Sequence, residues 1–142
     1  MKRISILLVM CLLHVFGGRL LALSAAPYFI SGNISDESLN ENEKYNFIGS
    51  FTNDSSKDVC SFTIVFYVFD EDGGCPLIQR NNVVIKIDEF IKAGKTSSFN
   101  KNLDKYFYAA AQGNYETEYL YVSRIVYSDG SEWSDPFGLE VF

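Results

Sequence analysis

The sequence predicts an all-β protein, a single antiparallel β-sandwich of about seven strands that follows a cleaved signal peptide. Segments in which apolar and polar side chains alternate recur along the chain, and this period of two is typical of half-buried strands. Asp-Gly and other Gly-rich steps separate the segments, as turns do. No segment has the apolar spacing of an amphipathic helix, so two facing sheets are the simplest way to bury the strands.

The first 24 residues have the pattern of a secretory signal peptide. Lys2 and Arg3 give a short basic start, an apolar run covers 4–16, and small residues favour cleavage after Ser24. A helix that spans a bilayer needs roughly twenty apolar residues. Because Gly17 ends the run before that length, a retained anchor is the less favoured alternative. We expect a secreted, periplasmic or cell-surface protein with no stable membrane insertion after cleavage.

Cleavage divides the chain into a signal peptide at 1–24, an extended segment and loop at 25–44, and a sandwich domain at 45–142. The leader contains three of the 12 Lys and Arg residues, so nine basic side chains in the mature protein stand against 18 acidic ones, a net charge of −9. A surface of that charge repels phosphate backbones and anionic lipids. We therefore expect no nucleic-acid partner.

The mature protein has no histidine, because His14, the only one in the chain, lies in the leader. This excludes histidine general bases, Ser-His-Asp and Cys-His nucleophiles, and imidazole metal sites. The sequence contains no catalytic, cofactor or metal motif, and we predict a protein that is not an enzyme and takes neither cofactor nor metal. The alternative is a secreted hydrolase with a carboxylate pair, since 18 acidic residues allow many pairings.

Strands are expected in the first half of the mature chain from two different patterns. After a short extended segment at 27–32 and a polar loop, Tyr45, Phe47 and Phe51 alternate with polar or small neighbours. The run at 62–69 is instead apolar on both faces. It predicts a central strand that is covered on two sides.

Three further strands are expected in the second half, at 83–88, 96–103 and 117–128. The segment 106–114 permits a helical turn, a loop or an irregular strand. Regular alternation would divide the apolar side chains of the last strand between two faces, with Tyr119, Tyr121, Ile125 and Tyr127 on one and Leu120, Val122 and Val126 on the other.

Two Asp-Gly steps are predicted to be two-residue hairpin turns, at Asp72-Gly73 and at Asp129-Gly130. A type I′ turn at the second step would place Trp133 across from about Val126. At the first step Asp70 and Asp72 alternate as in an EF-hand loop, but Gly74 and Asn81 stand where the fifth ligand and the closing glutamate would be. At the second, a calcium site is the less favoured alternative to a turn, with three carboxylates as its ligands, Asp129, Glu132 and Asp135.

Two arrangements are open for the mature cysteines, Cys60 and Cys75. Secretion to an oxidising space makes a disulfide the first hypothesis. A two-residue turn at Asp72-Gly73 would place Cys60 opposite about Ile85 and leave the sulfurs roughly 30 Å apart, so only a wide loop would allow the bond. If unpaired, they are expected to be small buried packing residues rather than nucleophiles.

Turn and strand landmarks between residues 46 and 134 carry a family resemblance. They lie in the stretches FIGSFTNDSS, FDEDGG, IKAGKTSSF and VSRIVYSDGSEW. In these the chain resembles the small immunoglobulin-like domains of bacterial envelope proteins, the FxLYD-like group. The resemblance implies an immunoglobulin-like sandwich at the cell envelope and supplies no functional residues. The chain departs from the group at Ala93, where proline is frequent, and in a longer C-terminal tail.

Two sequons for N-glycosylation begin at Asn33 and Asn53. In a eukaryotic secretory pathway they would be glycan acceptors. In a bacterial protein they would be ordinary polar residues of loops.

The function expected from the sequence is that of a non-enzymatic binding or interaction module, with a protein or a glycan as partner. Aromatic residues make up 15% of the chain, more than a small core hides easily. The candidate contact residues crowd one irregular region and are Tyr106, Phe107, Tyr108, Tyr115 and Tyr119. Packing inside the sandwich is the alternative for each of these rings.

Overall fold

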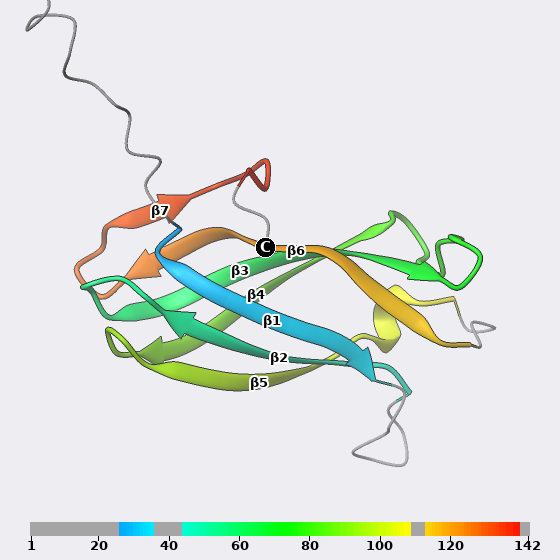
Figure 1. The fold of residues 1–142 in the computed structure, drawn as a ribbon, viewed down its shortest axis with the longest axis horizontal. Coiled ribbons are helices and arrows are strands. Elements are labelled where there is room, and N and C mark those ends of the chain that lie inside the picture. Colours follow the sequence, from blue (N-terminus) through cyan, green and yellow to red (C-terminus); the bar gives the residue numbers. More distant parts are fainter. Residues whose placement is uncertain (1–25, 36–43, 109–112, 140–142) are drawn as a thin grey trace, which may run out of the picture.

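Two antiparallel β-sheets face each other in the computed structural model, which describes residues 26–35, 44–108 and 113–139 (Figure 1). The first sheet has the order β1-β2-β5, with bounds Tyr28–Ser35, Asn46–Asn53 and Thr96–Asn102. The second has the order β4-β3-β6-β7, with bounds Asn82–Ile91, Val59–Asp70, Tyr115–Tyr127 and Glu132–Ser134. The prediction of seven strands in two antiparallel sheets is confirmed over these residues.

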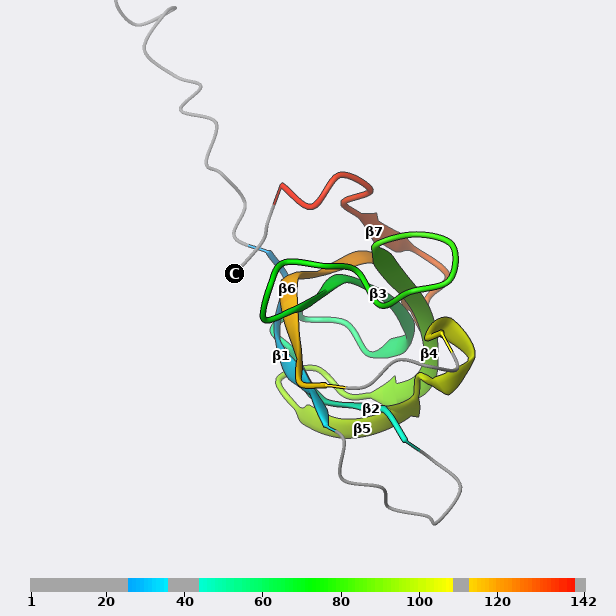
Figure 2. The same ribbon diagram turned by 90° about the vertical axis from the view of Figure 1, so that its right-hand side faces the viewer.

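The described parts of the chain contain no helix beyond η1, a single 3-10 turn at Asp104–Tyr106 that lies beside β4 (Figure 2). After this turn Phe107 forms an isolated bridge with Leu77. No helix of the described residues is long and apolar enough to cross a membrane. The predicted signal peptide at 1–24 and residues 109–112 of the ambiguous segment lie outside the described residues.

The core between the sheets is built largely from stacked aromatic rings. Phe47 of β2 stacks on Phe66 of β3 with ring centroids 4.4 Å apart, and Phe51 stacks on Phe62 at 4.1 Å. All four rings are buried, so the alternation predicted for the strand that contains Phe47 and Phe51 is confirmed. Stacked rings of this kind add about 0.5–1.5 kcal/mol per pair to the stabilisation that comes from burial.

The strand β3 is central, as its sequence predicts, but its second face is only partly covered. Phe62, Ile64 and the other inward residues are buried. On the outward face Val65 is buried, whereas Tyr67 and Phe69 remain partly exposed. No second layer of structure covers these two rings within the described residues, and they become part of the candidate site below.

Two glycines make room for the largest rings of the first sheet. Gly32 of β1 and Gly49 of β2 are directly opposite each other in the register. A Cβ on Gly49 would lie 2.8 Å from the ring of Phe99 and 2.9 Å from that of Phe47. These rings therefore fill the space that side chains would take at the two positions, which is why a β-branched residue does not fit there.

The strand β1 belongs to the sandwich, although its residues fall in the segment expected to precede it. It pairs with β2 along its whole length, from Tyr28 opposite Asn53 to Ser35 opposite Asn46. The hydroxyl of Tyr28 is buried and accepts a hydrogen bond of 3.1 Å from the Val122 amide of β6 in the other sheet. The domain therefore starts before Tyr28 rather than at residue 45.

The faces of β6 differ from the prediction because the strand is bulged. Its register against β3 shifts between Thr63 and Ile64 and again between Val65 and Tyr67. A bulge inserts one residue and reverses the alternation of side chains beyond it. The set predicted to share one face is therefore divided: Ile125 and Tyr127 are buried, Tyr121 is partly exposed and Tyr119 is largely exposed.

The predicted hairpin between β6 and β7 forms, but with a loop of three residues rather than two. The Tyr127 amide donates to the Ser131 carbonyl at 2.9 Å, and Gly130 adopts a left-handed conformation with φ of 80°. This is the common three-residue hairpin loop, a type I turn that is followed by a glycine in the left-handed conformation. The additional residue places Trp133 opposite Ile125 and turns its ring onto the core.

Asn53, the first residue of one sequon, is fully buried and bonded through its side chain to two segments. Its amide nitrogen donates to the carbonyls of Lys57 at 2.8 Å and Ile91 at 3.1 Å. Its side-chain oxygen accepts from the amide and the hydroxyl of Ser55. A glycan cannot be attached to this nitrogen in the folded protein, whereas Asn33 is exposed on β1.

Candidate functional site

The five rings proposed from the sequence as contact residues do not form one patch. Phe107 and Tyr115 are buried and pack around the ring of Tyr45, at centroid distances of 4.2 and 5.3 Å. These two are core residues. Tyr119 is 60% exposed and lies on the same strand as Tyr115, on the outer face of the β4-β3-β6-β7 sheet.

Tyr106 and Tyr108 lie near the surface, and their hydroxyls bond to β4 and to the loop that leads into it. The Tyr106 hydroxyl donates to the Val84 carbonyl at 3.3 Å, and the Tyr108 hydroxyl to the Ile78 carbonyl at 3.4 Å. Tyr106 lines a hollow of about 360 Å³ together with Arg80 and Lys105. The Tyr106 hydroxyl thus joins η1 to β4, and the Tyr108 hydroxyl joins the chain after η1 to the loop before β4.

Both cysteines are exposed, and no disulfide joins them. Cys60 is the second residue of β3, and Cys75 follows the far end of that strand, about ten strand residues or roughly 33 Å away. The disulfide is therefore absent, and the alternative that both are buried packing residues is also wrong. The hairpin register assumed for them is wrong as well, since Ile85 pairs with Ile64 and the loop before β4 is longer than two residues.

An open groove with aromatic walls lies on the outer face of the β4-β3-β6-β7 sheet. It encloses about 370 Å³, and five rings line it: Tyr67, Phe69, Tyr119, Tyr121 and Phe137. We call this the aromatic groove. Phe137 is 82% exposed, and the rings of Tyr67 and Tyr119 stand nearly perpendicular at 5.8 Å. Asn81 adds an amide to the lining.

The C-terminal tail forms one wall of the aromatic groove. The Asp135 amide donates to the Ser123 carbonyl at 3.0 Å and so continues the pairing of β7 with β6, and the chain then turns where the Gly138 amide donates to the Asp135 carbonyl at 3.4 Å (Figure 1). Gly138 then lies against Tyr121, where a Cβ would come within 3.0 Å of the ring. Burial, with smaller contributions from Tyr67 and Asp135, raises the pKa of Tyr121. Its hydroxyl therefore keeps its proton to a higher pH than the hydroxyl of an exposed tyrosine does.

Tyr119 has a strained backbone that aims its ring into the aromatic groove. Its φ is 51°, and among the described residues it is the one non-glycine with a positive φ. The left-handed conformation costs a tyrosine about 1–2 kcal/mol. The strain coincides with the second β-bulge of β6, and bulges often re-aim a side chain beside a functional site.

Carboxylates continue the aromatic groove at one end. The adjoining hollow shares Phe69 with the groove and is lined by Asp70, Glu71, Glu116 and Glu118. The register places Glu118 opposite Tyr67 and Glu116 opposite Phe69. The ion pairs of the described residues join other side chains, so no Lys or Arg of those ranges neutralises Glu116 or Glu118.

The sequence did not indicate most of this groove. Tyr67 and Phe69 lie within a run that is apolar on both faces, and alternation cannot tell which face is covered. Phe137 lies in the tail beyond the last expected strand. Of the five proposed contact residues, only Tyr119 lines the groove.

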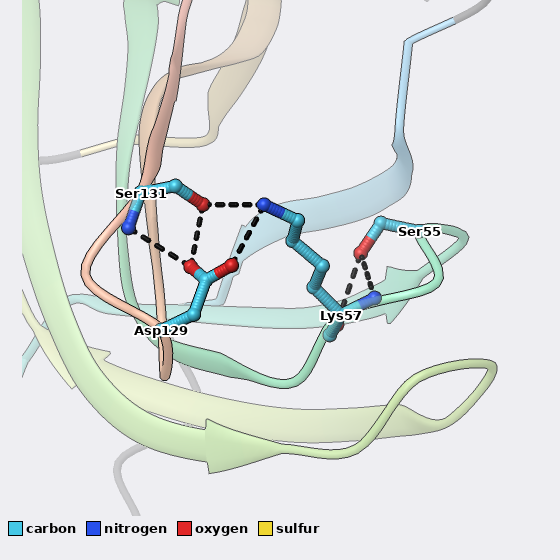
Figure 3. Close-up of polar contacts among 4 residues, drawn as sticks. All are labelled: Ser55, Lys57, Asp129 and Ser131. Atoms are coloured by element: carbon cyan, nitrogen blue, oxygen red, sulfur yellow. Dashed lines mark hydrogen bonds and ion pairs between the residues drawn. The ribbon is translucent and has the colours of Figure 1, made fainter.

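A polar cluster at the other end of the sandwich brings together Lys57, Asp129 and Ser131 (Figure 3). The Lys57 amine donates to the Ser131 hydroxyl at 2.7 Å, whereas a lysine that activates a serine nucleophile would accept the proton of the hydroxyl. The same amine forms an ion pair of 2.8 Å with Asp129. The Ser131 hydroxyl in turn donates to Asp129 at 2.5 Å, so the cluster links the β2–β3 loop to the β6–β7 hairpin and shows no base that could take the serine proton.

The three carboxylates weighed as calcium ligands have other roles. Asp129 pairs with Lys57 and Glu132 with Arg124, while Asp135 is buried beside the tail. Within 26–35, 44–108 and 113–139, no three His, Cys, Asp or Glu side chains are placed to hold a metal ion together.

Asp129 is expected to make stability depend on pH. The bond from Lys57, followed by those from Ser131, holds the pKa of Asp129 below its usual range in the folded protein. Its stabilising contribution is therefore complete above the unfolded value of about 4 and is lost as the pH falls toward the folded value. In urea titrations, Asp129→Asn should lower the unfolding midpoint at neutral pH, and its difference from wild type should shrink progressively below about pH 4.

The control for this prediction is Asp88→Asn. Asp88 pairs with Lys86 two residues away on the same strand, so that pair joins no separate segments. Asp88→Asn should leave the midpoint of urea unfolding unchanged at every pH. A pH-independent effect of Asp129→Asn would mean that the cluster does not act through the charge of Asp129.

Comparisons with known proteins bear on the fold. No family model and no curated protein matches the sequence. Among solved structures, the chain is similar to a crystal structure of a hypothetical protein from Peptoclostridium difficile 630, with a TM-score of 0.54 and 12% sequence identity over 77% of this chain and 86% of that one. At this identity the similarity is one of fold, a β-sandwich of two antiparallel sheets.

Proposed function

We propose that this protein is an exported, non-enzymatic binding module of the immunoglobulin-like type, and that the aromatic groove is its ligand site. The leader pattern at 1–24 supports export to the envelope or the medium. The strand order supports the immunoglobulin-like part. Strands β1, β2 and β5 face β3, β6 and β7, as strands A, B and E face C, F and G in immunoglobulin domains, whereas β4 lies beside β3.

The observation that carries the proposal is the exposure of adjacent rings in one groove. Contiguous exposed apolar surface on a soluble protein commonly marks an interaction site. Tyr119 is both exposed and strained, so the fold gains little from that ring at that place. Known ligand sites combine aromatic walls with a few polar groups, and here Asn81 and the neighbouring carboxylates supply them.

Tyr119→Gly tests the proposal because it separates binding from stability. Glycine accepts a positive φ without strain, so the free energy of unfolding should equal that of wild type or exceed it by up to about 1 kcal/mol. Binding should be lost. The measurement is retention of the labelled mature protein on immobilised peptide and glycan arrays, alongside urea unfolding.

Phe29→Ser is the matched control. Phe29 is also an exposed ring, 57% accessible, but it lies on β1 in the other sheet. It should leave array binding intact. Equal loss in both variants, or no retention of wild type on either array, would contradict the proposal. Turnover of an array substrate that Glu118→Gln abolishes would instead support the carboxylate hydrolase.

A further inference from the structure

Two ring–carboxylate pairs repeat along the aromatic groove. Tyr67 of β3 is opposite Glu118 of β6, and Phe69 is opposite Glu116. The two pairs are two residues apart on both strands and project from the same outer face. Two strand residues span about 6.8 Å. The groove therefore offers the same combination of one ring and one carboxylate twice, at the repeat of an extended chain.

Each pair fits a basic side chain. An Arg or Lys head group is attracted to the face of an aromatic ring, and a carboxylate beside the ring adds a charge-assisted hydrogen bond. The apolar stem of the same side chain can cover the ring while its charge stays at the rim. Arginine fits best, since its planar guanidinium both stacks on rings and bonds carboxylates in a bidentate manner.

The charge of the protein also favours a basic side chain in the groove. The predicted mature chain carries a net charge of −9. No Lys or Arg of the described residues lines the aromatic groove or the adjoining acidic hollow. A neutral glycan could stack on the rings but would leave Glu116 and Glu118 without a counter-charge.

We propose that the aromatic groove binds an extended basic peptide segment in which Arg or Lys side chains at positions i and i+2 lie against the Tyr67–Glu118 and Phe69–Glu116 pairs. Side chains two apart in an extended chain point to the same side, about 6.8 Å apart, and so match the two pairs in direction and spacing. This inference rests on the proposed function and specifies its ligand.

Fluorescence polarisation with labelled ten-residue Gly/Ser peptides tests the inference. The probes carry two Arg at positions 5 and 7, two Arg at 5 and 6, or two Glu at 5 and 7; a chitin oligosaccharide is the neutral probe. The 5/7 Arg peptide should bind the mature protein about tenfold more tightly than the 5/6 peptide, and the Glu peptide should not bind. Raising the salt to 0.5 M should weaken binding.

Glu116→Gln and Glu118→Gln should each weaken binding of the 5/7 Arg peptide about threefold and leave the thermal stability of the protein unchanged. Asp88→Asn, which removes an exposed carboxylate from β4, should have no effect. Equal binding of the 5/7 and 5/6 peptides, or wild-type affinity in both Gln variants, would overturn the inference. Binding of the oligosaccharide that Tyr119→Gly abolishes would refute the basic peptide yet preserve the groove as the ligand site. If Tyr119→Gly weakens no probe, the proposed function fails as well.

Discussion

Phe47→Ala is expected to lower the free energy of unfolding by about 4 kcal/mol, the largest effect of any single substitution considered. The Phe47 ring is fully buried, stacks on Phe66 at 4.4 Å and on Phe99 at 6.0 Å, and fills the space over Gly32 and Gly49. Because Gly32 and Gly49 lie beneath the ring, no side chain on that side can move in to close the cavity. Urea unfolding followed by circular dichroism measures the change.

Ile48→Ala is the control for this prediction. Ile48 is the next residue of β2, but it points outward and is 45% exposed. Loss of the Ile48 side chain should lower the free energy of unfolding by less than about 1 kcal/mol. A loss of under about 2 kcal/mol for Phe47→Ala would mean that the core relaxes around the missing ring.

Asn53→Ala should lower the free energy of unfolding by about 3 kcal/mol. The substitution leaves the carbonyls of Lys57 and Ile91 without the donor that Asn53 supplies, and it releases the loop hydroxyl of Ser55. Buried polar groups without a partner cost about 1–3 kcal/mol each. Thermal and urea unfolding give the value.

Two further variants make the test specific. Asn53→Asp keeps the size of the side chain but removes both N–H donors, so it should be at least as destabilising as alanine at neutral pH. Asn100→Ala, at an exposed position on β5, should stay within about 0.5 kcal/mol of wild type. If Asn53→Asp lowers the free energy of unfolding much less than Asn53→Ala does, the shape of the side chain matters at this position rather than the hydrogen bonds that it donates.

The class of the fold could be predicted from local patterns because each strand carries its own evidence. Alternation at Tyr45, Phe47 and Phe51 predicted which side of that strand is buried, and the structure places all three in the core. The apolar run at 62–69 predicted a central strand, and β3 is central between β4 and β6. Asp129-Gly130 predicted a hairpin, and β6 and β7 form one.

Most of the candidate site could not be predicted, because it depends on register and on what covers each face. Two bulges in β6 separate Tyr119 and Tyr121 from Ile125 and Tyr127, although the sequence alternates as if they shared a face. A bulge leaves no clear trace in apolar spacing, since it is chosen by the fit between neighbouring strands. Likewise Phe107 and Tyr115 occupy the core that Tyr45 completes, and nothing near them in the chain says so.

The amino-acid sequence by itself determined that this protein is built of antiparallel strands, where most of the strands lie, and that residues 25–142 are acidic and contain no histidine. Only the tertiary structure decided which rings are buried, that the cysteines stay apart, and that Tyr67, Phe69, Tyr119, Tyr121 and Phe137 gather in one groove. The physical reason is the distance along the chain over which each effect acts. Side-chain periodicity acts between near neighbours, whereas loop length, bulges and the packing of one sheet on another join residues that are far apart in the chain.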